Sequence, residues 1–383
     1  MKEYNDLYPI LDPSFNSGLD YAEQLYINDK LKNWWKESTL KKILTWSISQ
    51  ENQELLKKLK VIDFHSHIWN ILQRDITQIY DDTREFPVDI RTIWSNIWKF
   101  KAPWKIMNAI MHTKIVDDIL KQSWKNRNSS ATLKTFWKSL EESFIDKAVC
   151  LPIAPYQTYD DLNEASLHNN DIIAFSWIDF SKFYSRDKSY YEVLSDIENQ
   201  FRLDVLNWSK WLKIHPIIQW ISVDTNMVDD VVDLWTSVSK WLPIIFHTWV
   251  TEYCKKDENC SQHRPEYGQI KYFIKLAEKH KDANIVIWHS WLFQVDEVID
   301  HLAIFENVSV DTSFQWEEKI KQLLFSFWVE RLHFASDWPY WDRIPAVNVM
   351  LDTLSKVHSS LFSDERMKEL IFRDNALRSM KLK

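Results

Sequence analysis

A single (β/α)8 barrel with helical additions is the fold that the sequence predicts, on three observations. Short apolar runs recur along the chain, segments with helical periodicity separate them, and metal-binding residue types follow several of the runs. Strands that alternate with helices pair in parallel, because each parallel pair needs a long crossover connection. Eight such units that close on themselves form a barrel, and an open doubly wound sheet is the alternative.

Eight apolar runs are the candidate strands, and two helical regions flank the first of them. Residues 1–60 form a helical N-terminal extension, in which apolar residues recur at intervals of three and four. Residues 70–145 are again helical, and we expect this insertion after the first strand to cap one end of the barrel. The barrel itself spans residues 61–383. The candidate strands are Val61–His67, Ala148–Ile153, Ile172–Phe180, Leu212–Ile218, Ile244–His247, Ile285–His289, Val308–Asp311 and Leu332–Ser336.

Composition and charge indicate a globular protein and exclude several classes of partner. Hydrophobic residues make up 45% of the 383 residues and charged residues 27%, as is usual for soluble domains. A net charge of −8 without a basic cluster argues against binding nucleic acid. No apolar stretch reaches about 20 residues, so no membrane span is expected. Cys150, Cys254 and Cys260, with no signal peptide, indicate reduced thiols in the cytoplasm.

Glycine and tryptophan occur in abnormal numbers. A chain of this length usually has about 27 glycines, but this one has two, Gly18 and Gly268, and 22 tryptophans. The tryptophans stand where backbone geometry favours glycine, at turns and straight after strands. Examples are Trp69, Trp249, Trp288 and Trp291. We hypothesise that many are glycine in the living protein, because a gene that reads UGA as glycine was translated with UGA as tryptophan. UGG codons there would exclude this, and Trp338 is the first candidate for a genuine tryptophan.

Residues able to bind a metal lie at the ends of the predicted strands. His65 and His67 end the first strand and, being two residues apart, point to the same face. His247 ends the fifth strand, His289 ends the sixth, and Asp337 follows the eighth. The carboxyl ends of barrel strands meet at one face, where catalytic residues lie. Three histidines with a carboxylate suit zinc, and a buried aspartate needs such a cation to balance its charge.

These stretches resemble the amidohydrolase superfamily, and within it the amidohydrolase-2 branch of metal-dependent hydrolases and decarboxylases. The resemblance covers roughly residues 60–380 and leaves the N-terminal extension and the cap unexplained. The matching stretches are Val61–His67, Trp211–Pro216, Pro243–Thr248, Ile285–Trp291, Phe334–Pro339 and Asp374–Arg378. Glycine in place of Trp211, Trp249, Trp288 and Trp291 would tighten the match, which independently supports the recoding hypothesis.

The resemblance implies an enzyme that acts on a small molecule with the help of a divalent cation. His65, His67, His247 and Asp337 would bind one ion, which the donor set suggests is zinc. Such an ion lowers the pKa of water from about 15.7 to about 7, and Asp337 would act as the general base. His289 would polarise the substrate and stabilise the developing oxyanion, or bind a second ion.

Three cationic residues are candidates for binding the substrate. Lys213 occupies the strand-four position, where relatives with two metals carry a carbamylated lysine that bridges the ions; otherwise it would bind a substrate carboxylate. One ion is favoured, because the Lys-Ile-His-Pro sequence at this position is common in single-metal relatives. Arg264, after the fifth strand, and Arg343, six residues past Asp337, lie on loops expected to face the site. Either could pair with a carboxylate.

Three functions stay open at this point. The metal site could hydrolyse an ester, lactone or amide, it could decarboxylate an acid without oxidation, or the barrel could bind metal without catalysis. The presence of all five site residues argues against the last. A serine hydrolase is excluded, because the nucleophile elbow needs glycine two residues after the serine, where Leu292 stands. The substrate, the metal in the cell and the oligomeric state, including a homo-oligomer, are left open.

Overall fold

The computed structural model describes residues 47–68, 83, 127–152, 157–185, 187–248, 265–289 and 295–382. Most of the predicted N-terminal extension and cap insertion, residues 1–46, 69–82 and 84–126, lies outside the described residues. The end of the extension is α3 (Gln50–Leu59), whose N-cap Ser49 accepts a hydrogen bond from Asn52 N. Helix α3 leads directly into the first strand.

The described strands pair in parallel, in two sheets ordered β1-β2-β3 and β4-β5-β6-β7-β8-β9. A single residue, Phe175, separates β3 from β4, so these two form one interrupted strand. The bounds are β1 (Val61–Ser66), β2 (Ile145–Cys150), β3 (Ile172–Ala174), β4 (Ser176–Trp177), β5 (Leu212–Ile214), β6 (Ile244–His247), β7 (Ile285–Trp288), β8 (Val308–Asp311) and β9 (Leu332–His333). All eight predicted strands are therefore present.

Backbone contacts join the last strand segment to the first. Phe64 N donates to Phe334 O over 2.9 Å, and Asp337 N donates to His65 O over 2.8 Å. Ser66 also forms a parallel bridge with Trp338. These contacts bring the chain after β9 alongside β1, so the strand order closes on itself, as a barrel requires.

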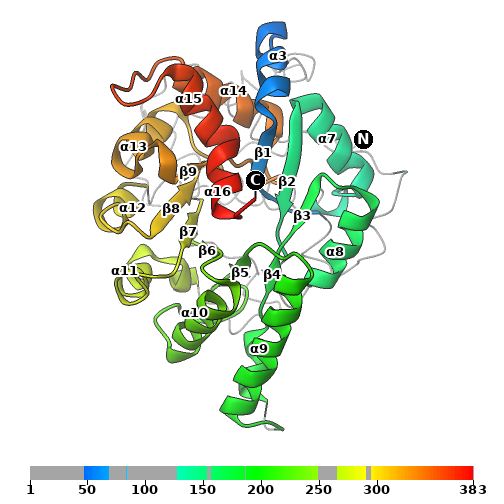
Figure 1. Ribbon diagram of the computed structural model, residues 1–383, viewed down its shortest axis with the longest axis vertical. Coiled ribbons are helices and arrows are strands. Elements are labelled where there is room, and N and C mark those ends of the chain that lie inside the picture. The colour runs from blue at the N-terminus through cyan, green and yellow to red at the C-terminus, as the bar shows by residue number, and fades with distance from the viewer. Residues whose placement is uncertain are drawn as a thin grey trace, which may run out of the picture.

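Helices surround the strands (Figure 1). Three of them begin with a capping box, in which the hydroxyl of Thr132, Thr158 or Ser189 accepts from the backbone of the third helical residue. The longer helices are α7 (Leu133–Ser143), α8 (Tyr159–His168), α9 (Tyr190–Leu206), α10 (Asn226–Ser239), α11 (Ile270–Lys279), α12 (Val295–Leu302), α13 (Glu317–Phe327) and α14 (Arg343–Leu354). Shorter segments are η3 (Phe180–Tyr184), η4 (Pro265–Gly268), η5 (Val329–Arg331), α15 (Asp364–Glu369), the π-helical η6 (Leu370–Asp374) and α16 (Asn375–Ser379).

Two hydrophobic clusters form the core, one on each side of the strands. In β6, Ile244 and Phe246 belong to the larger cluster and Ile245 to the smaller one, because successive strand residues point to opposite faces. The smaller cluster contains Ile62, Phe64, Val149, Leu151, Phe175, Trp211, Ile245, Val286, Trp288, Ala335, Ala376 and Met380. Ala376 belongs to α16, which lies across the centre of the strands in Figure 1.

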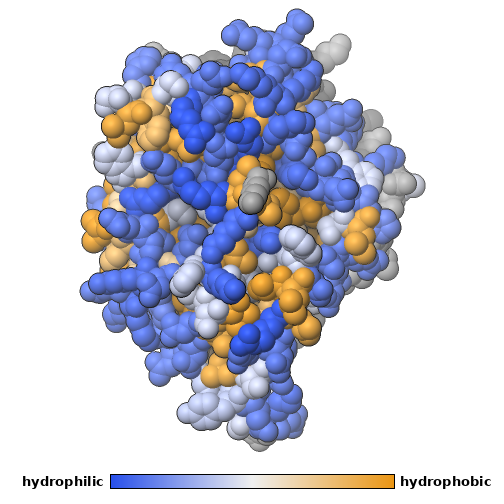
Figure 2. All heavy atoms as spheres, viewed as in Figure 1, coloured by the Kyte–Doolittle hydropathy of each residue, from blue (hydrophilic) through white to orange (hydrophobic). Residues whose placement is uncertain are grey.

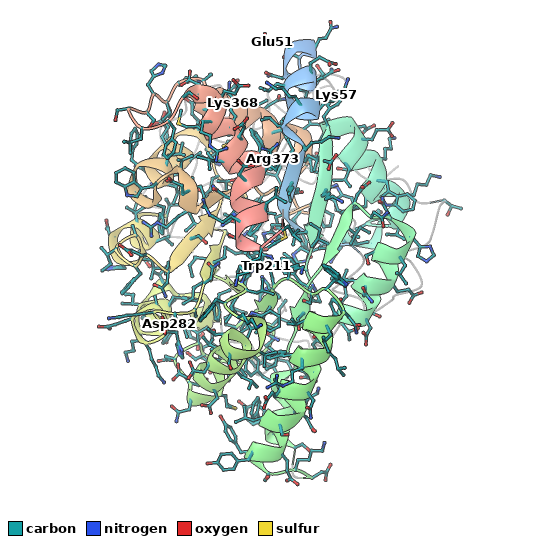
Figure 3. All side chains as sticks on the ribbon, viewed as in Figure 1. Glu51, Lys57, Trp211, Asp282, Lys368 and Arg373 are labelled. Atoms are coloured by element: carbon teal, nitrogen blue, oxygen red, sulfur yellow. The ribbon has the colours of Figure 1, made fainter. Side chains whose placement is uncertain are left out.

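One face of the molecule is mainly polar (Figure 2). Figure 2 shows that hydrophilic side chains cover most of the face in view, with hydrophobic groups scattered between them. In Figure 3, Trp211 lies in the middle of the molecule, whereas the charged Glu51, Asp282 and Lys368 lie toward its edge. Among the described residues, no helix has the length and apolar character needed to cross a bilayer.

Candidate metal centre

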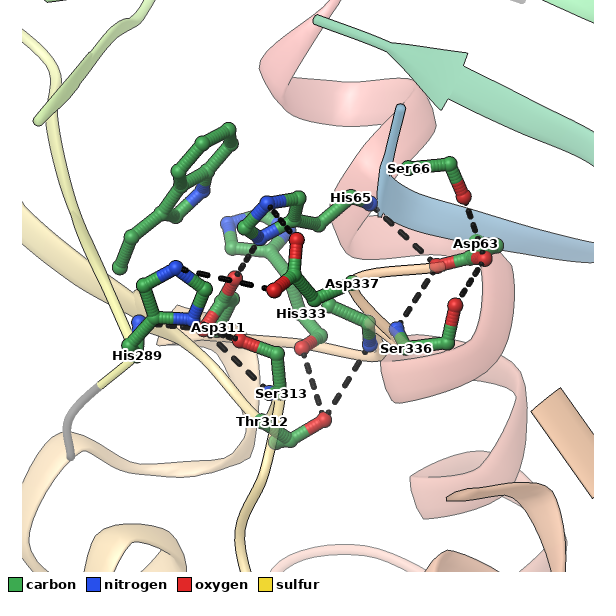
Figure 4. A network of polar contacts seen from close by, with 12 residues as sticks. Asp63, His65, Ser66, His289, Asp311, Thr312, Ser313, His333, Ser336 and Asp337 are labelled. Carbon is green, nitrogen blue, oxygen red and sulfur yellow. Dashed lines mark hydrogen bonds and ion pairs between the residues drawn. The ribbon is translucent and has the colours of Figure 1, made fainter. Parts of the chain in front are cut away.

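Three side chains meet at the seam between β1 and the segment that follows β9. His65 Nε2 lies 3.2 Å from His67 Nε2 and 2.7 Å from Asp337 Oδ1. His67 Nε2 lies 3.3 Å from the same oxygen. All three residues are buried, and Figure 4 shows His65 beside Asp337. The structure thus brings together three of the four residues that the sequence suggested as metal ligands.

Hydrogen bonds at the outer ring nitrogens determine where the histidine protons are. His67 Nδ1 lies 3.0 Å from Leu151 O, and a carbonyl can only accept, so Nδ1 must carry the hydrogen. His65 Nδ1 faces Asp311 Oδ2 at 2.8 Å, and the ionised carboxylate of Asp311 would likewise accept the hydrogen of Nδ1. Burial is the main reason that the pKa of His67 falls to about 3, so its ring is neutral and Nε2 has a lone pair. Two imidazole lone pairs and a carboxylate oxygen therefore converge, an arrangement that a cation would stabilise.

Asp311, the last residue of β8, holds the ring of His65. Its Oδ1 accepts from His289 N at 3.0 Å and from Ser313 Oγ at 2.9 Å, while Oδ2 faces His65. Burial raises the pKa of Asp311 to about 7, although the hydrogen bonds from Ser313 and His289 act in the opposite direction. A carboxylate behind a metal-binding histidine fixes the orientation of the ring. No role is predicted for Asp311 from the sequence, in which its position at a strand end was the available signal.

His289 presents an acceptor nitrogen to Asp337. Its Nε2 lies 3.9 Å from Asp337 Oδ2, and one ligand atom each from His65, His289 and Asp337 lie within 4.8 Å of one another. His289 Nδ1 lies 3.0 Å from Ser313 Oγ, whose hydroxyl donates to Asp311. Ser313 must then accept from His289 Nδ1, so in the neutral tautomer of this ring Nε2 is the nitrogen with the lone pair. This arrangement suits a ligand or a base better than the predicted donor to an oxyanion.

Two more histidines extend the group beside His289. His247, at the end of β6, contacts His289 with ring centroids 4.7 Å apart. His215, which follows β5, stacks on His247 with centroids 3.8 Å apart. Burial is the main cause that lowers the pKa of both His215 and His247, so both rings are neutral. His247 is thus in the site, next to His289, and His215 is an addition whose signal was again its place after a strand.

The backbone of the site is strained at two residues. His289 has a φ of 57° and Asp337 has a φ of 60°, in the left-handed region that residues other than glycine seldom adopt. His289 comes directly after β7 and Asp337 comes four residues after β9, and the positive φ turns the chain there. Strained backbone of this kind persists only where the surroundings determine it, and it clusters at functional sites.

Lys213 points from β5 to the same buried region. Its Nζ lies 2.9 Å from the centroid of the Trp288 ring. Within the described residues, Nζ has no hydrogen-bond partner. Burial lowers the pKa of Lys213 far below its ordinary value. A carbamate bridge and a contact with a substrate carboxylate both remain compatible with this placement.

Arg343 lies in a different buried cluster. Its Nε donates to Asp63 Oδ2 and its Nη2 to Ser66 Oγ, each over 2.9 Å, and Nη1 donates to Phe136 O over 3.2 Å. Only 1% of the residue is exposed. Arg343 therefore does not lie on a loop that faces the site, as predicted, but is the first residue of α14 and points into the core. Arg264 lies outside the described residues.

The family model described as Amidohydrolase matches residues 242–381. The search of curated proteins found no match.

Several solved structures resemble the fold. An uncharacterized TIM-barrel protein from Bordetella bronchiseptica has a TM-score of 0.55 and 12% identity, over 84% of this chain and 98% of that one. The 5-carboxyvanillate decarboxylase of Sphingomonas paucimobilis has a TM-score of 0.51 and 12% identity, over 85% and 100%. A variant of the Novosphingobium aromaticivorans enzyme of that name contains bound manganese and 3-methoxy-4-hydroxy-5-nitrobenzoic acid. It has a TM-score of 0.52 and 14% identity, over 85% of this chain and 98% of that one. Likeness at such low identity concerns the fold alone, and it agrees with the predicted barrel.

Proposed function

We propose that this chain, which carries an amidohydrolase segment over residues 242–381, is a metal-dependent enzyme that acts on a carbonyl or carboxyl carbon of a small molecule. One observation carries the proposal: His65 Nε2, His67 Nε2 and Asp337 Oδ1 lie within 3.3 Å of one another. Histidine nitrogen and carboxylate oxygen are the donors that divalent transition metals prefer. With no cation among them, these acceptors would repel each other in a buried setting.

The ligand set proposed here is His65, His67 and Asp337, with His289 Nε2 3.9 Å from Asp337 Oδ2 and His247 next to His289. Zinc is our first choice for this donor set, and manganese, which one of the structural neighbours binds, is the alternative. A bound ion of either kind supplies Lewis-acid activation of a water molecule or of a substrate oxygen.

The protein's own groups then have proton-transfer roles. Asp337 can take a proton from the attacking water through Oδ2 and return it to the leaving group. His289 Nε2, 3.9 Å from that oxygen, is a second proton acceptor. The buried surroundings of both residues exclude bulk water and strengthen their electrostatic interactions.

Hydrolysis of an ester, lactone or amide is the reaction that we propose first. Non-oxidative decarboxylation is a second candidate, because Lys213 Nζ is buried without a hydrogen-bond partner in the described part of the chain, as expected for a group that receives a carboxylate. A barrel that binds metal without turnover is the third. A panel of esters, lactones and amides set against aromatic carboxylic acids, with carbon dioxide release as a second readout, separates the three.

Metal content tests the site directly. We expect His67→Ala to lower the affinity for zinc or manganese by more than about 100-fold, since even changes behind the ligands cost roughly 10–100-fold. His280→Ala is the matched control: His280 is also buried between carboxylates, those of Asp229 and Asp233, but belongs to no converging set. Elemental analysis of both variants after dialysis gives the result. Full metal content in His67→Ala would refute the assignment.

A further inference from the structure

Four tryptophans in the described part of the chain have backbone angles that suit glycine. The φ angles are 74° for Trp208, 54° for Trp220, 70° for Trp241 and 60° for Trp328. A bulky side chain is disfavoured at such angles, whereas glycine adopts them readily. Trp328 also has a ψ of 154°, a combination that is almost restricted to glycine. All four side chains are exposed, so burial does not offset the strain.

Trp208 also occupies a position in a helix-ending motif that glycine usually fills. Trp208 N donates to Val205 O over 3.2 Å, and Ser209 N donates to Asp204 O over 2.8 Å. These two bonds define a Schellman motif at the end of α9, with Trp208 as its left-handed residue. The backbone geometry therefore indicates that tryptophan occupies positions that favour glycine. This evidence is independent of the amino-acid composition.

Trp288 conflicts with its surroundings through space. Its ring lies face to face with that of His65, at a centroid distance of 3.4 Å and an angle of 15°. Aromatic pairs usually keep about 4.5–7 Å between centroids and avoid full overlap. Lys213 Nζ also lies over the Trp288 ring, 2.9 Å from its centroid. The indole is fully buried, and its Nε1 has no acceptor among the described residues, which costs free energy.

Trp235 gives the contrast within the same molecule. It is equally buried, but its Nε1 donates to Leu242 O over 2.9 Å. Its ring meets that of Phe201 edge to face, with centroids 5.1 Å apart. The protein therefore accommodates a buried tryptophan well in α10 and poorly in β7.

We infer that position 288 is glycine in the protein that the cell makes, and that the space now filled by the indole, between the His65 ring and Lys213 Nζ, is the substrate pocket. The pocket assignment rests on the proposed function, whereas the glycine assignment does not. An occupant must be flat to lie on the His65 ring, and it must offer a hydrogen-bond acceptor such as a carboxylate oxygen to Lys213 Nζ. The side chain at position 288 then determines the size of the substrate, because any residue larger than glycine fills the pocket.

The codons give the first test. We expect UGA at position 288 and at the four positive-φ positions, and UGG at Trp235. Peptide mass spectrometry of the protein from its own cells should then find glycine at 288 and tryptophan at 235. UGG at position 288 would overturn the glycine assignment, whether or not any variant folds.

A binding experiment tests the pocket. With benzoate as the probe, Trp288→Gly should bind at least about tenfold more tightly than the parent chain, a gain of about 1.4 kcal/mol, and adding Lys213→Met should remove the gain. Metal content is measured on the same samples. A loss of metal with the benzoate gain intact would count against the proposed function alone. Equal benzoate affinity of parent and Trp288→Gly, with metal bound, would overturn the pocket.

Thermal unfolding controls for the fold of these variants. Trp235→Gly removes a well-packed ring and should lower Tm by roughly 5–10 °C or more. Trp288→Gly should leave Tm unchanged or raise it, because it relieves an overpacked ring and an unsatisfied N–H group. Equal losses of Tm in the two variants would contradict the inference.

Discussion

Two buried polar clusters share strand β1 and balance their charges in different ways. Asp63 pairs with Arg343 at 2.9 Å and accepts further hydrogen bonds, from Ser66 Oγ at 2.8 Å, from Ser336 Oγ at 2.6 Å and from the backbone N–H groups of His65 and Ser336. Two residues further along the strand, His65 joins His67 and Asp337, where acceptor atoms face one another. Figure 4 shows Asp63 with Ser66 and Ser336 on one side, and His65 with Asp337 on the other.

The two clusters differ in whether folding alone balances their charges. The Asp63 cluster contains its own cation and its own donors, so folding completes it. The Asp337 cluster places a carboxylate against imidazole lone pairs, an arrangement that a bound cation would complete. Changes in the first cluster should therefore affect stability, and changes in the second should affect metal binding.

The largest effect is expected for Arg343→Met, which keeps the stem of the side chain and removes the charge. Asp63 is then left as an uncompensated buried carboxylate, and the free energy of unfolding should fall by about 3–5 kcal/mol. Urea denaturation measures the loss. The double variant Asp63→Asn with Arg343→Met should lose less than the sum of the two single changes. A loss below about 1 kcal/mol for Arg343→Met would mean that the ion pair is not structural.

We expect an effect of intermediate size on stability for a third buried carboxylate. Asp204 accepts a hydrogen bond from the hydroxyl of Ser176, and burial raises its pKa to about 6 from 3.8. The folded state binds this proton more tightly than the unfolded state. Its contribution to stability is therefore complete below about pH 4 and is lost as the pH rises through 6.

Asp204→Asn tests this pH dependence. Relative to the parent chain, the variant should gain up to about 3 kcal/mol of unfolding free energy between pH 4 and pH 7, at about 1.4 kcal/mol per pKa unit. Urea titrations at the two pH values measure the gain. Parallel stability curves for the two proteins would show that burial does not penalise this carboxylate.

Apolar periodicity was enough to locate the strands, because each barrel strand is a short buried run between helices. The bounds predicted for Ile244–His247 and Val308–Asp311 are those of β6 and β8. The spacing of His65 and His67 also placed both rings on one side, since strand side chains alternate. The prediction of the third strand as one run, Ile172–Phe180, missed the interruption at Phe175.

Long-range pairings were beyond the reach of the sequence. Arg343 follows Asp337 closely, and nothing in that spacing reveals that its partner is Asp63, 280 residues away. Asp311 was counted as a strand end without a role, because its function depends on facing His65 across the barrel. Such contacts follow from how the strands close, which local patterns do not specify.

The smallest effect is expected for Asp311→Asn. The change keeps the shape of the side chain but weakens its hold on His65 Nδ1, so the ring loses its fixed orientation and part of its basicity. Carboxylates behind metal-bound histidines typically contribute roughly 10–100-fold to metal affinity. Competition with a chelator of known affinity measures the difference, and the stability of the metal-free protein should change little.

Asp229→Asn is the matched control for this last prediction. Asp229 faces His280 Nε2 at 2.8 Å, the same chemical pair and distance as Asp311 and His65, but it adjoins no converging acceptors. Its substitution should leave metal affinity unchanged. Equal metal affinity for Asp311→Asn and the parent would imply that the ring of His65 is held by its packing. The metal-binding cluster would then include Asp337 but not Asp311.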